Sequence, residues 1–395
     1  MSKHADNSNG RPRGMDTRLA QGLSDPLDRH GFIHPPVYRG STVLFPDVAA
    51  MRSRKQEYTY GTITPTTNEL CNELNDLEGA AHTVLTPNGL SAITVPMLSC
   101  LSAGDHALVI DSCYAPTRRF CETILKRMGV EVDYYPPAIG GDITGWMKPN
   151  TKVVFAEAPS SNCFQMMDVP AVASAAHVAN TDVVVMMDNT YATPLYFKPL
   201  DHGCDISIHA LTKYPSGHSD LLLGACSMNA RTAERVAETN NALGLCVGAD
   251  EIQLVMRGLK TMGLRLRHQE ASANHLANWL DGLNEVIRVM HPALPSDPGH
   301  EIWKRDFGGS CGLFSFVLNT EDPQKAAAFV DALQLFGLGY SWAGHESLVV
   351  LPDFSDRTCS APTDGGTVVR LQIGLENVED LQADIEQALS AAGLS

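Results

Sequence analysis

Two residues near the middle of the sequence have the types and the spacing of a catalytic pair. Asp188 ends the apolar run DVVVMMD, and Lys213 follows a second apolar run within SIHALTKYPSGHSD. Each run has the length and the β-rich composition of a buried strand. Because side chains at the carboxyl ends of such strands face the ligand crevice of an open α/β sheet, we expect both residues in one crevice.

A carboxylate and a lysine in one crevice are what a pyridoxal phosphate (PLP) site requires. The lysine amine reacts with the cofactor aldehyde and later moves a proton at the substrate α-carbon, which demands a pKa lowered by burial. The carboxylate keeps the pyridine nitrogen protonated, so that the ring accepts the charge left on the α-carbon. Gly89 and Leu90 open a helix after the turn TPNG, and their backbone N–H groups suit the cofactor phosphate.

Each of these signals is weak when it stands alone. A lysine beside a tyrosine is most often an exposed residue, and an aspartate after a strand most often caps a helix or forms a turn. The order along the chain, a glycine turn, then Asp188, then Lys213, favours the PLP interpretation.

The segments around these residues alternate between strand and helix patterns. Apolar runs typical of strands lie at 106–110, 152–157, 182–188, 205–210 and 221–228. One helix is expected to begin near Gly89, and another to follow Tyr114 and run to Gly129. Continuous apolar strands between helices indicate an α/β fold with a mostly parallel sheet that is covered on both faces.

Three regions follow from the pattern along the chain. Residues 1–64 are rich in Pro and Gly and show little periodicity, so they are expected to form an arm that packs on something else. Residues 65–260 form the large, cofactor-binding domain. A long charged helix from about residue 261 opens a smaller C-terminal domain, 261–395, with an α+β pattern.

Composition narrows the classes of partner. The chain has 395 residues and a net charge of −16, which excludes an extended basic patch for nucleic acid or anionic lipid. Its ten cysteines contain no C-x-x-C pair, so neither a disulfide framework nor a zinc ribbon is indicated. No segment has the length of a signal peptide or a membrane helix. A cytoplasmic enzyme with a small-molecule substrate and no metal is expected.

Four segments carry a resemblance to a known family. They are YTYGTITPTTNELCNELNDLEGA, DNTYATPLYFKPLDHGCDISIHALTKYPSGHSDLLLGA, HPALPSDPGHEIWKRDFGGSCGLFSFVL and YSWAGHESLVV. Together they resemble the Cys/Met-metabolism family of fold-type-I PLP enzymes, from about residue 17 to the C-terminus. The resemblance implies the fold-type-I transferase fold, a homotetramer built from active dimers, and a carbon–sulfur lyase that acts in methionine biosynthesis.

Matching positions imply the roles of individual residues in binding the cofactor. Lys213 would bind the cofactor covalently, Asp188 would pair with the pyridine nitrogen, and Tyr114 would stack on the ring. Gly89, Leu90 and Thr212 would hold the phosphate.

Other matching positions imply roles toward the substrate and the partner. Arg370 would bind the substrate α-carboxylate through two parallel hydrogen bonds from its guanidinium group. Tyr60 would reach across from a neighbouring subunit and contribute to catalysis as well as to cofactor binding, as would Tyr114 within its own subunit.

Two features of the sequence favour elimination at the β-carbon. Ser341 and Trp342 match the segment of the β-acting members, whereas γ-acting members usually carry leucine after the serine. Ser161 stands where those relatives usually carry asparagine. β-Elimination of L-cystathionine to homocysteine, pyruvate and ammonia is therefore expected, with cysteine S-conjugates as further candidate substrates. A γ-lyase or a γ-replacement synthase is the alternative.

One position departs from the family pattern. The family usually places an arginine that binds the cofactor phosphate after the Tyr60-Gly61 pair, but the run here is YGTITPT, apparently one residue shorter. Thr62 cannot supply the missing charge, so weaker PLP retention or a compensating basic residue is expected.

Three other classes of protein fit the sequence less well. Gly308–Gly312 reads G-x-S-x-G around Ser310, but the motif precedes a strand-like run, whereas a hydrolase nucleophile follows a strand. The set His202, Cys204, His209 and His218 lacks a compact metal-ligand spacing. A PLP fold kept only as a binding module would need a broken catalytic set, and Lys213 and Asp188 are both present.

Overall fold

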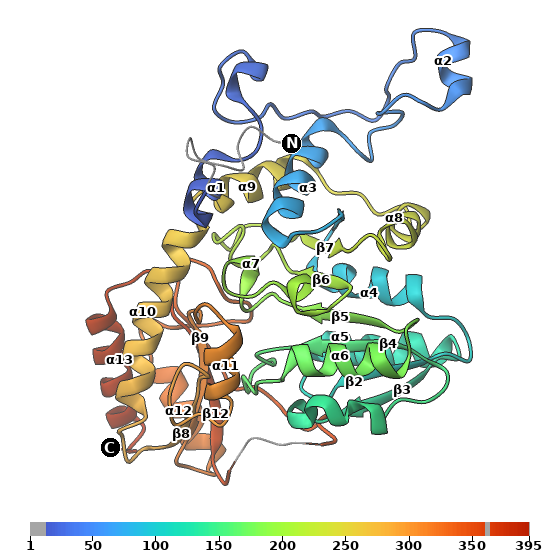
Figure 1. Cartoon of the computed structure of the whole chain (residues 1–395). Coiled ribbons are helices and arrows are strands. Elements are labelled where there is room, and N and C mark those ends of the chain that lie inside the picture. The colour runs from blue at the N-terminus through green and yellow to red at the C-terminus, as the bar shows by residue number, and fades with distance from the viewer. Residues whose placement is uncertain (1–12, 360–363, 395) are drawn as a thin grey trace.

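The computed structural model describes residues 13–359 and 364–394, and it contains two β-sheets (Figure 1). The larger sheet has seven strands in the order β1-β7-β6-β5-β4-β2-β3. The smaller sheet has five strands in the order β10-β11-β12-β9-β8. The protein therefore has the α/β architecture expected from the sequence, with a second, smaller α+β unit.

The seven-stranded sheet is mostly parallel. Its strands are β1 (His82–Thr86), β2 (His106–Ile110), β3 (Glu131–Tyr135), β4 (Thr151–Glu157), β5 (Val184–Asp188), β6 (Ile206–His209) and β7 (Gly224–Met228). The pairs from β3 through β2, β4 and β5 to β6 are parallel, and β7 is antiparallel to both β6 and β1. Strands β4, β5 and β6 therefore end at the same edge of the sheet. The strand predicted at 221–228 begins three residues later than expected.

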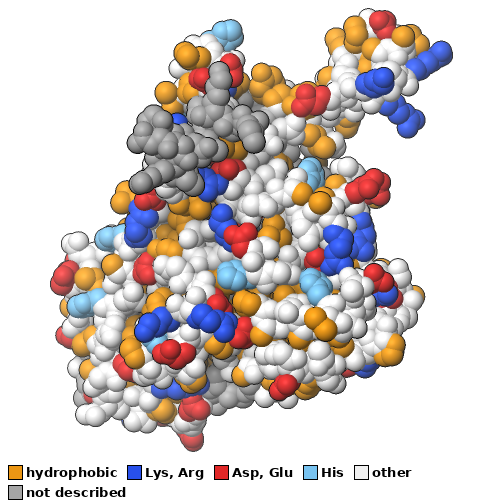
Figure 2. Space-filling model, viewed as in Figure 1, with side chains coloured by type: hydrophobic (Ala, Val, Ile, Leu, Met, Phe, Trp, Pro, Cys, Tyr) orange, Lys and Arg blue, Asp and Glu red, His pale blue; other side chains and the backbone are white. Residues whose placement is uncertain are grey.

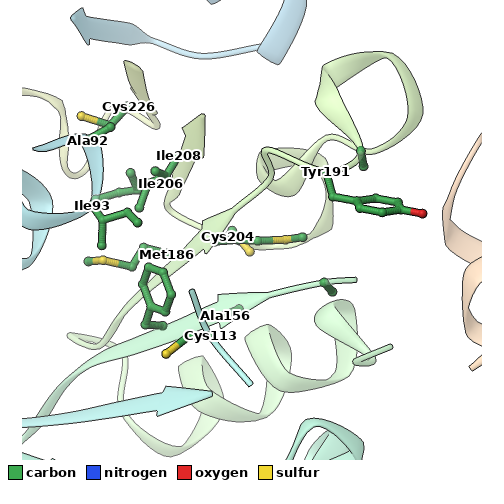
Figure 3. Close-up of a cluster of buried hydrophobic side chains, with 14 of the residues drawn as sticks. Ala92, Ile93, Cys113, Ala156, Met186, Tyr191, Cys204, Ile206, Ile208 and Cys226 are labelled. Carbon is green, nitrogen blue, oxygen red and sulfur yellow. The ribbon is translucent and has the colours of Figure 1, made fainter. Parts of the chain in front are cut away.

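Helices cover both faces of this sheet (Figure 1). The helices of this unit are α3 (Pro65–Glu78), α4 (Gly89–Cys100), α5 (Ala115–Phe120), the π-helix η2 (Cys121–Leu125), η3 (Pro137–Gly145), α6 (Val169–Ala179), α7 (Thr193–Tyr196), η4 (Pro199–His202), α8 (Ala233–Ala242) and α9 (Ala249–Leu259). Because both faces are covered, β2 is buried along its whole length and its sequence, HALVI, is almost entirely apolar. Figure 3 shows Ala92 and Ile93 of α4 near Ile206 and Ile208 of β6.

The five-stranded sheet has its own core. Its elements are β8 (Val286–Met290), α11 (His300–Asp306), β9 (Leu313–Leu318), α12 (Pro323–Ala332), β10 (Gly337–Leu338), β11 (Leu348–Val350), β12 (Thr367–Gln372) and α13 (Val378–Ala391). Phe314, Phe316 and Phe329 are fully buried in this second core.

The long helix α10 (Met262–Leu280) joins the two cores. Met262 and Leu266 near its start belong to the core under the larger sheet, whereas Leu276 and Leu280 near its end belong to the core of the smaller sheet. The helix is continuous, so it fixes the distance between the two units.

A buried carboxylate ties the smaller unit back to the larger one. Asp111, directly after β2, is fully buried and accepts hydrogen bonds from the backbone N–H groups of Thr358 (2.9 Å) and Cys359 (3.0 Å). It also accepts from Arg118 Nη2 at 2.5 Å. Arg357 Nη1 donates to the Asp111 carbonyl oxygen at 2.7 Å. Residues 357–359, which lie in the loop between β11 and β12, therefore bind the edge of the larger sheet.

The N-terminal segment contains only short helices, α1 (Met15–Gln21), η1 (Pro26–Arg29) and α2 (Val48–Ser53). The α2 region stands away from the rest of the molecule (Figure 1), and Figure 2 shows hydrophobic and basic side chains on it. Leu44 on this segment is 84% exposed. Docking of the arm on a neighbouring subunit stays a prediction, as do the three domain boundaries. Residues 1–12 of the predicted arm lie outside the described residues.

The larger unit ends in two helices, α8 and α9, that the sequence patterns did not predict individually.

No helix within residues 13–359 and 364–394 is long and apolar enough to cross a membrane.

Candidate active site

Lys213 lies in the turn after β6, close to a loop of the smaller unit. Its Nζ donates a hydrogen bond to Ser341 Oγ at 2.5 Å and lies 5.1 Å from the centre of the Trp342 ring. Burial and the positive charge of Arg370 together lower the pKa of Lys213 to about 8, although the negative charge of Asp188 opposes the shift. The amine therefore reaches its neutral, nucleophilic form near physiological pH.

Asp188 is the last residue of β5, at the edge where β4, β5 and β6 end. Its Oδ1 accepts a hydrogen bond from the backbone N–H of Thr190 at 2.9 Å, which orients the carboxylate. Burial raises the pKa of Asp188, whereas the positive charge of Lys213 lowers it. The structure thus brings the predicted pair into electrostatic contact.

Glu157 is a second acidic residue at this edge, and the sequence patterns did not single it out. It ends β4 and is the in-register partner of Asp188 on β5. Its carboxylate accepts hydrogen bonds from the backbone N–H of Tyr114 (2.8 Å) and from Ser161 Oγ (2.5 Å). Burial raises the pKa of Glu157 to about 8, and the nearby charge of Asp188 adds to the shift. Its position at the end of KVVFAE, the strand before DVVVMMD, was the available signal.

Arg370, on β12, faces the same site from the smaller unit. Its Nη1 donates to Asn162 Oδ1 at 2.9 Å, and its Nη2 donates to the carbonyl oxygen of Ser341 at 3.1 Å. Its buried Nε has no hydrogen-bond partner within the described residues. Burial lowers the pKa of Arg370 to about 10. A buried N–H without a partner is costly, so this side chain is prepared to receive an anionic group.

The predicted phosphate cradle lies at the start of α4. Asn88 caps this helix by accepting from Ser91 N at 2.9 Å, which leaves Gly89 and Leu90 in the first turn, where N–H groups lack partners within the helix. A Cβ atom on Gly89 would lie 2.6 Å from Ala210 Cβ, so only glycine fits this close approach to the end of β6.

Thr212 is the third residue predicted to hold the phosphate. Its hydroxyl donates to the carbonyl oxygen of Leu223 at 3.1 Å and accepts from Leu223 N at 3.0 Å. These two bonds fix the backbone immediately before Lys213.

The two predicted tyrosines differ in position. Tyr114 is 45% exposed, and burial, Asp188 and Glu157 raise its pKa while Arg370 lowers it, so it lies among the charged groups of the site. Tyr60 is 60% exposed in the arm. Among the described residues, no hydrogen bond, ion pair or ring contact joins Tyr60 to the other predicted site residues. The predicted contribution of Tyr60 from a neighbouring subunit therefore stays a prediction.

The remaining candidate residues show no competing site. Ser310 is fully buried between α11 and β9, and its backbone N–H donates to Glu270 Oε1 at 2.8 Å. This helix-to-strand order is the reverse of a nucleophile elbow. Within residues 13–359 and 364–394, no group of three or more His, Cys, Asp or Glu side chains is arranged to hold a metal ion.

The residues at the strand edge fit PLP. A lysine of lowered pKa and a partly buried aspartate lie beside a glycine-led helix start, and an arginine with an unpartnered buried N–H faces them. A covalent attachment point, a partner for the pyridine nitrogen and an anion site are therefore present together. Fold and site define a PLP-dependent enzyme.

Comparison with known proteins places this enzyme in a family. The model of the family "Cys/Met metabolism PLP-dependent enzyme" matches residues 16–390, and the chain belongs to this family. Its cofactor is pyridoxal phosphate, and its substrate is of the amino-acid class.

Relatives and a solved structure agree with this assignment. The chain is 57% identical over 385 residues to a "Putative cystathionine beta-lyase" of Rhizobium johnstonii, with 96% of each chain covered. It is 39% identical to "Cystathionine beta-lyase MetC" of Escherichia coli, covering 94% of this chain and 97% of the relative. The crystal structure of metB from Corynebacterium glutamicum superposes with a TM-score of 0.89 at 28% identity, covering 96% of this chain and 98% of that chain.

Proposed function

We propose that this enzyme cleaves the β-carbon–sulfur bond of L-cystathionine, with water consumed and homocysteine, pyruvate and ammonia released. The observation that carries the proposal is the 2.5 Å hydrogen bond between Lys213 Nζ and Ser341 Oγ, with Trp342 beside the amine and Arg370 bonded to the same loop. The two relatives named cystathionine β-lyase support the same reaction.

Each residue has a defined task in this proposal. Arg370 binds the substrate α-carboxylate through its free N–H groups, which places the α-carbon toward Lys213. The Lys213 amine removes the α-proton and returns a proton to the departing sulfur atom, and Ser341 Oγ holds that amine in place. Asp188 would hold the pyridine nitrogen of the cofactor and keep it protonated. PLP, when bound, supplies the electron sink that makes the α-proton acidic.

The products of L-cystathionine distinguish the candidate reactions. Purified enzyme loaded with PLP is incubated with L-cystathionine, and the 2-oxo acid and the thiol are identified by mass spectrometry. Pyruvate with homocysteine is expected. 2-Oxobutyrate with cysteine would instead assign the enzyme to γ-elimination. Absence of product, with the cofactor covalently bound, would reject cystathionine as the substrate and keep the PLP site.

We further propose that active sites form between subunits, in a cytoplasmic homotetramer built from dimers. The exposure of Tyr60 and of apolar residues such as Leu44 on the protruding arm supports this assembly. Mixing a Tyr60→Phe variant with a Lys213→Ala variant should restore activity, because hybrid dimers contain one intact site. The matched mixture of Tyr114→Phe with Lys213→Ala should stay inactive, since both residues come from the same subunit. Equal activity of the two mixtures would contradict the assembly.

A further inference from the structure

The loop that carries Ser341 and Trp342 has an unusual backbone. Ser341 has a φ of 83° and Ala343 has a φ of 69°, both in the left-handed region that residues with a side chain rarely adopt. Such a conformation persists only where neighbouring groups hold it. The loop Ser341–Gly344 therefore needs fixed contacts to keep the Ser341 hydroxyl against Lys213.

One of these contacts comes from outside the predicted site. Gln269, in the middle of α10, is fully buried, and its Nε2 donates to the carbonyl oxygen of Gly344 at 2.6 Å. In the described part of the chain, Arg370 is the other side chain that donates to a carbonyl of this loop, at Ser341. The backbone of Gly312 packs closely on Gln269, since a Cβ added at Gly312 would lie 2.9 Å from Gln269 Cβ.

The turn that carries Lys213 is held by the same helix, one turn earlier. Arg265 Nη2 donates to the carbonyl oxygens of Tyr214 and Gly258, both at 2.8 Å. Gly217, with a φ of 68°, packs so closely that a Cβ there would lie 1.9 Å from Arg265 Nη1. Because Gly217 N also donates to the carbonyl oxygen of Lys213 at 2.8 Å, the turn is fixed at both ends.

Residues four apart lie on the same side of a helix, so Arg265 and Gln269 hold two loops from one rigid element. We infer that Gln269, together with Arg265, is a positioning residue that sets the contact between Lys213 Nζ and Ser341 Oγ. The inference rests on the proposed function only for its kinetic consequence, since the contact itself exists without substrate.

Gln269→Leu removes the donor to Gly344 while keeping a side chain of similar size. A displacement of about 1 Å at a reacting group costs up to roughly 100-fold in rate, so kcat/KM should fall about 10- to 100-fold. The pH midpoint at which the absorbance of the bound cofactor changes should also move, because the Lys213 amine loses its fixed partner. This spectroscopic titration needs no substrate.

Gln269→Glu is a conservative variant that should restore the hydrogen bond to Gly344 when its carboxyl group is protonated. A protonated carboxyl group donates to the Gly344 carbonyl oxygen, whereas an ionised one repels it. The activity of Gln269→Glu relative to wild type should therefore rise as the pH falls, while that of Gln269→Leu should not. Absence of this rise would overturn the inference.

Leu276→Ala is the matched control for lost stability. Leu276 is fully buried on the same helix but belongs to the core of the smaller sheet. It should lower the melting temperature and leave the cofactor titration unchanged. If the pH midpoint of the cofactor absorbance moved equally in Leu276→Ala and Gln269→Leu, Gln269 would contribute only to the stability of the fold and not to the position of Lys213. A wild type that shows the titration but does not cleave cystathionine would reject the proposed substrate and leave the positioning role standing.

Discussion

Glu157 and Asp188 end two neighbouring parallel strands, β4 and β5, as partners in register. Both carboxyl groups have raised pKa values because of burial, and the charge of Asp188 adds to the shift of Glu157. Glu157 also accepts the backbone N–H of Tyr114. The pair therefore holds a proton in the folded protein under conditions in which free carboxyl groups are ionised.

Replacement of Glu157 by Gln should remove part of the pH dependence of stability. The pKa of Glu157 is raised from 4.5 to about 8, so its contribution is complete below pH 4.5 and is lost as the pH rises toward 8. Between pH 5.5 and 8.5, the cofactor-free wild type should lose more stability than Glu157→Gln, because Glu157 gives up its proton over this range. Urea denaturation at several pH values measures this difference. Parallel losses in the two proteins would contradict the assignment, and exposed Glu131→Gln serves as the control.

Capture of PLP by the cofactor-free protein should depend on the neutral form of Lys213. Because the pKa of this amine is lowered to about 8, the capture rate should rise with pH and level off just above 8. An unshifted amine would continue to accelerate toward pH 10. Arg370→Met removes a positive charge that lowers the pKa, so its plateau should move to higher pH. Stopped-flow absorbance follows the reaction, and Lys213→Ala, which should also lack turnover, gives the baseline.

Arg370→Lys should weaken substrate binding more than it slows the chemical step. Lysine keeps the charge but loses the planar fork that binds a carboxylate at two points. Loss of a charge-assisted hydrogen bond costs about 1.5–3 kcal/mol, so KM should rise by about 10- to 100-fold. Steady-state kinetics measures the KM of the variant. Arg305→Lys, a change at an exposed arginine, is the control. An unchanged KM would remove Arg370 from the carboxylate site.

Thr62→Arg should strengthen cofactor retention. Thr62 is exposed in this chain and carries no charge, at the place where the resemblance implies an arginine that binds the phosphate. A restored charge-assisted bond should lower the dissociation constant for PLP about 10- to 100-fold. Equilibrium dialysis against PLP compares the variant with Thr62→Gln, which has a neutral side chain of intermediate length. Because the resemblance implies a segment one residue longer at this point, Ile63→Arg is tested alongside. No gain in either arginine variant would show that phosphate binding does not depend on this segment.

Local sequence patterns predicted the strands that carry the site. Each is a short apolar run between helix signals, and the side chain at its end must face the ligand edge. Asp188 and Lys213 were therefore found from the sequence, and the folded chain brings the two into electrostatic contact. The roles assigned to them remain predictions, since they rest on resemblance.

Contacts between distant segments could not be predicted in the same way. Glu157 gains its role from the in-register pairing of β4 with β5, which the sequence does not specify. Gln269 looks like any polar residue of a charged helix, and its bond to Gly344 joins positions 75 residues apart. Arg370 and Asn162 are separated by 208 residues. Such pairings depend on the packing of the two units, which local periodicity does not describe.

The tie at Asp111 bears on how far the two units can separate. The chain leaves the larger unit through α10 and binds it again through Thr358 and Cys359, in addition to the contacts of Ser341 and Arg370 at the candidate site. Swinging them apart about α10 would take the hydrogen bonds of Thr358 and Cys359 from the buried Asp111 carboxylate, at a cost of about 1.5–3 kcal/mol for each bond, and would leave it paired with Arg118 of its own unit. The bonds at Asp111 therefore oppose a wide separation of the two units.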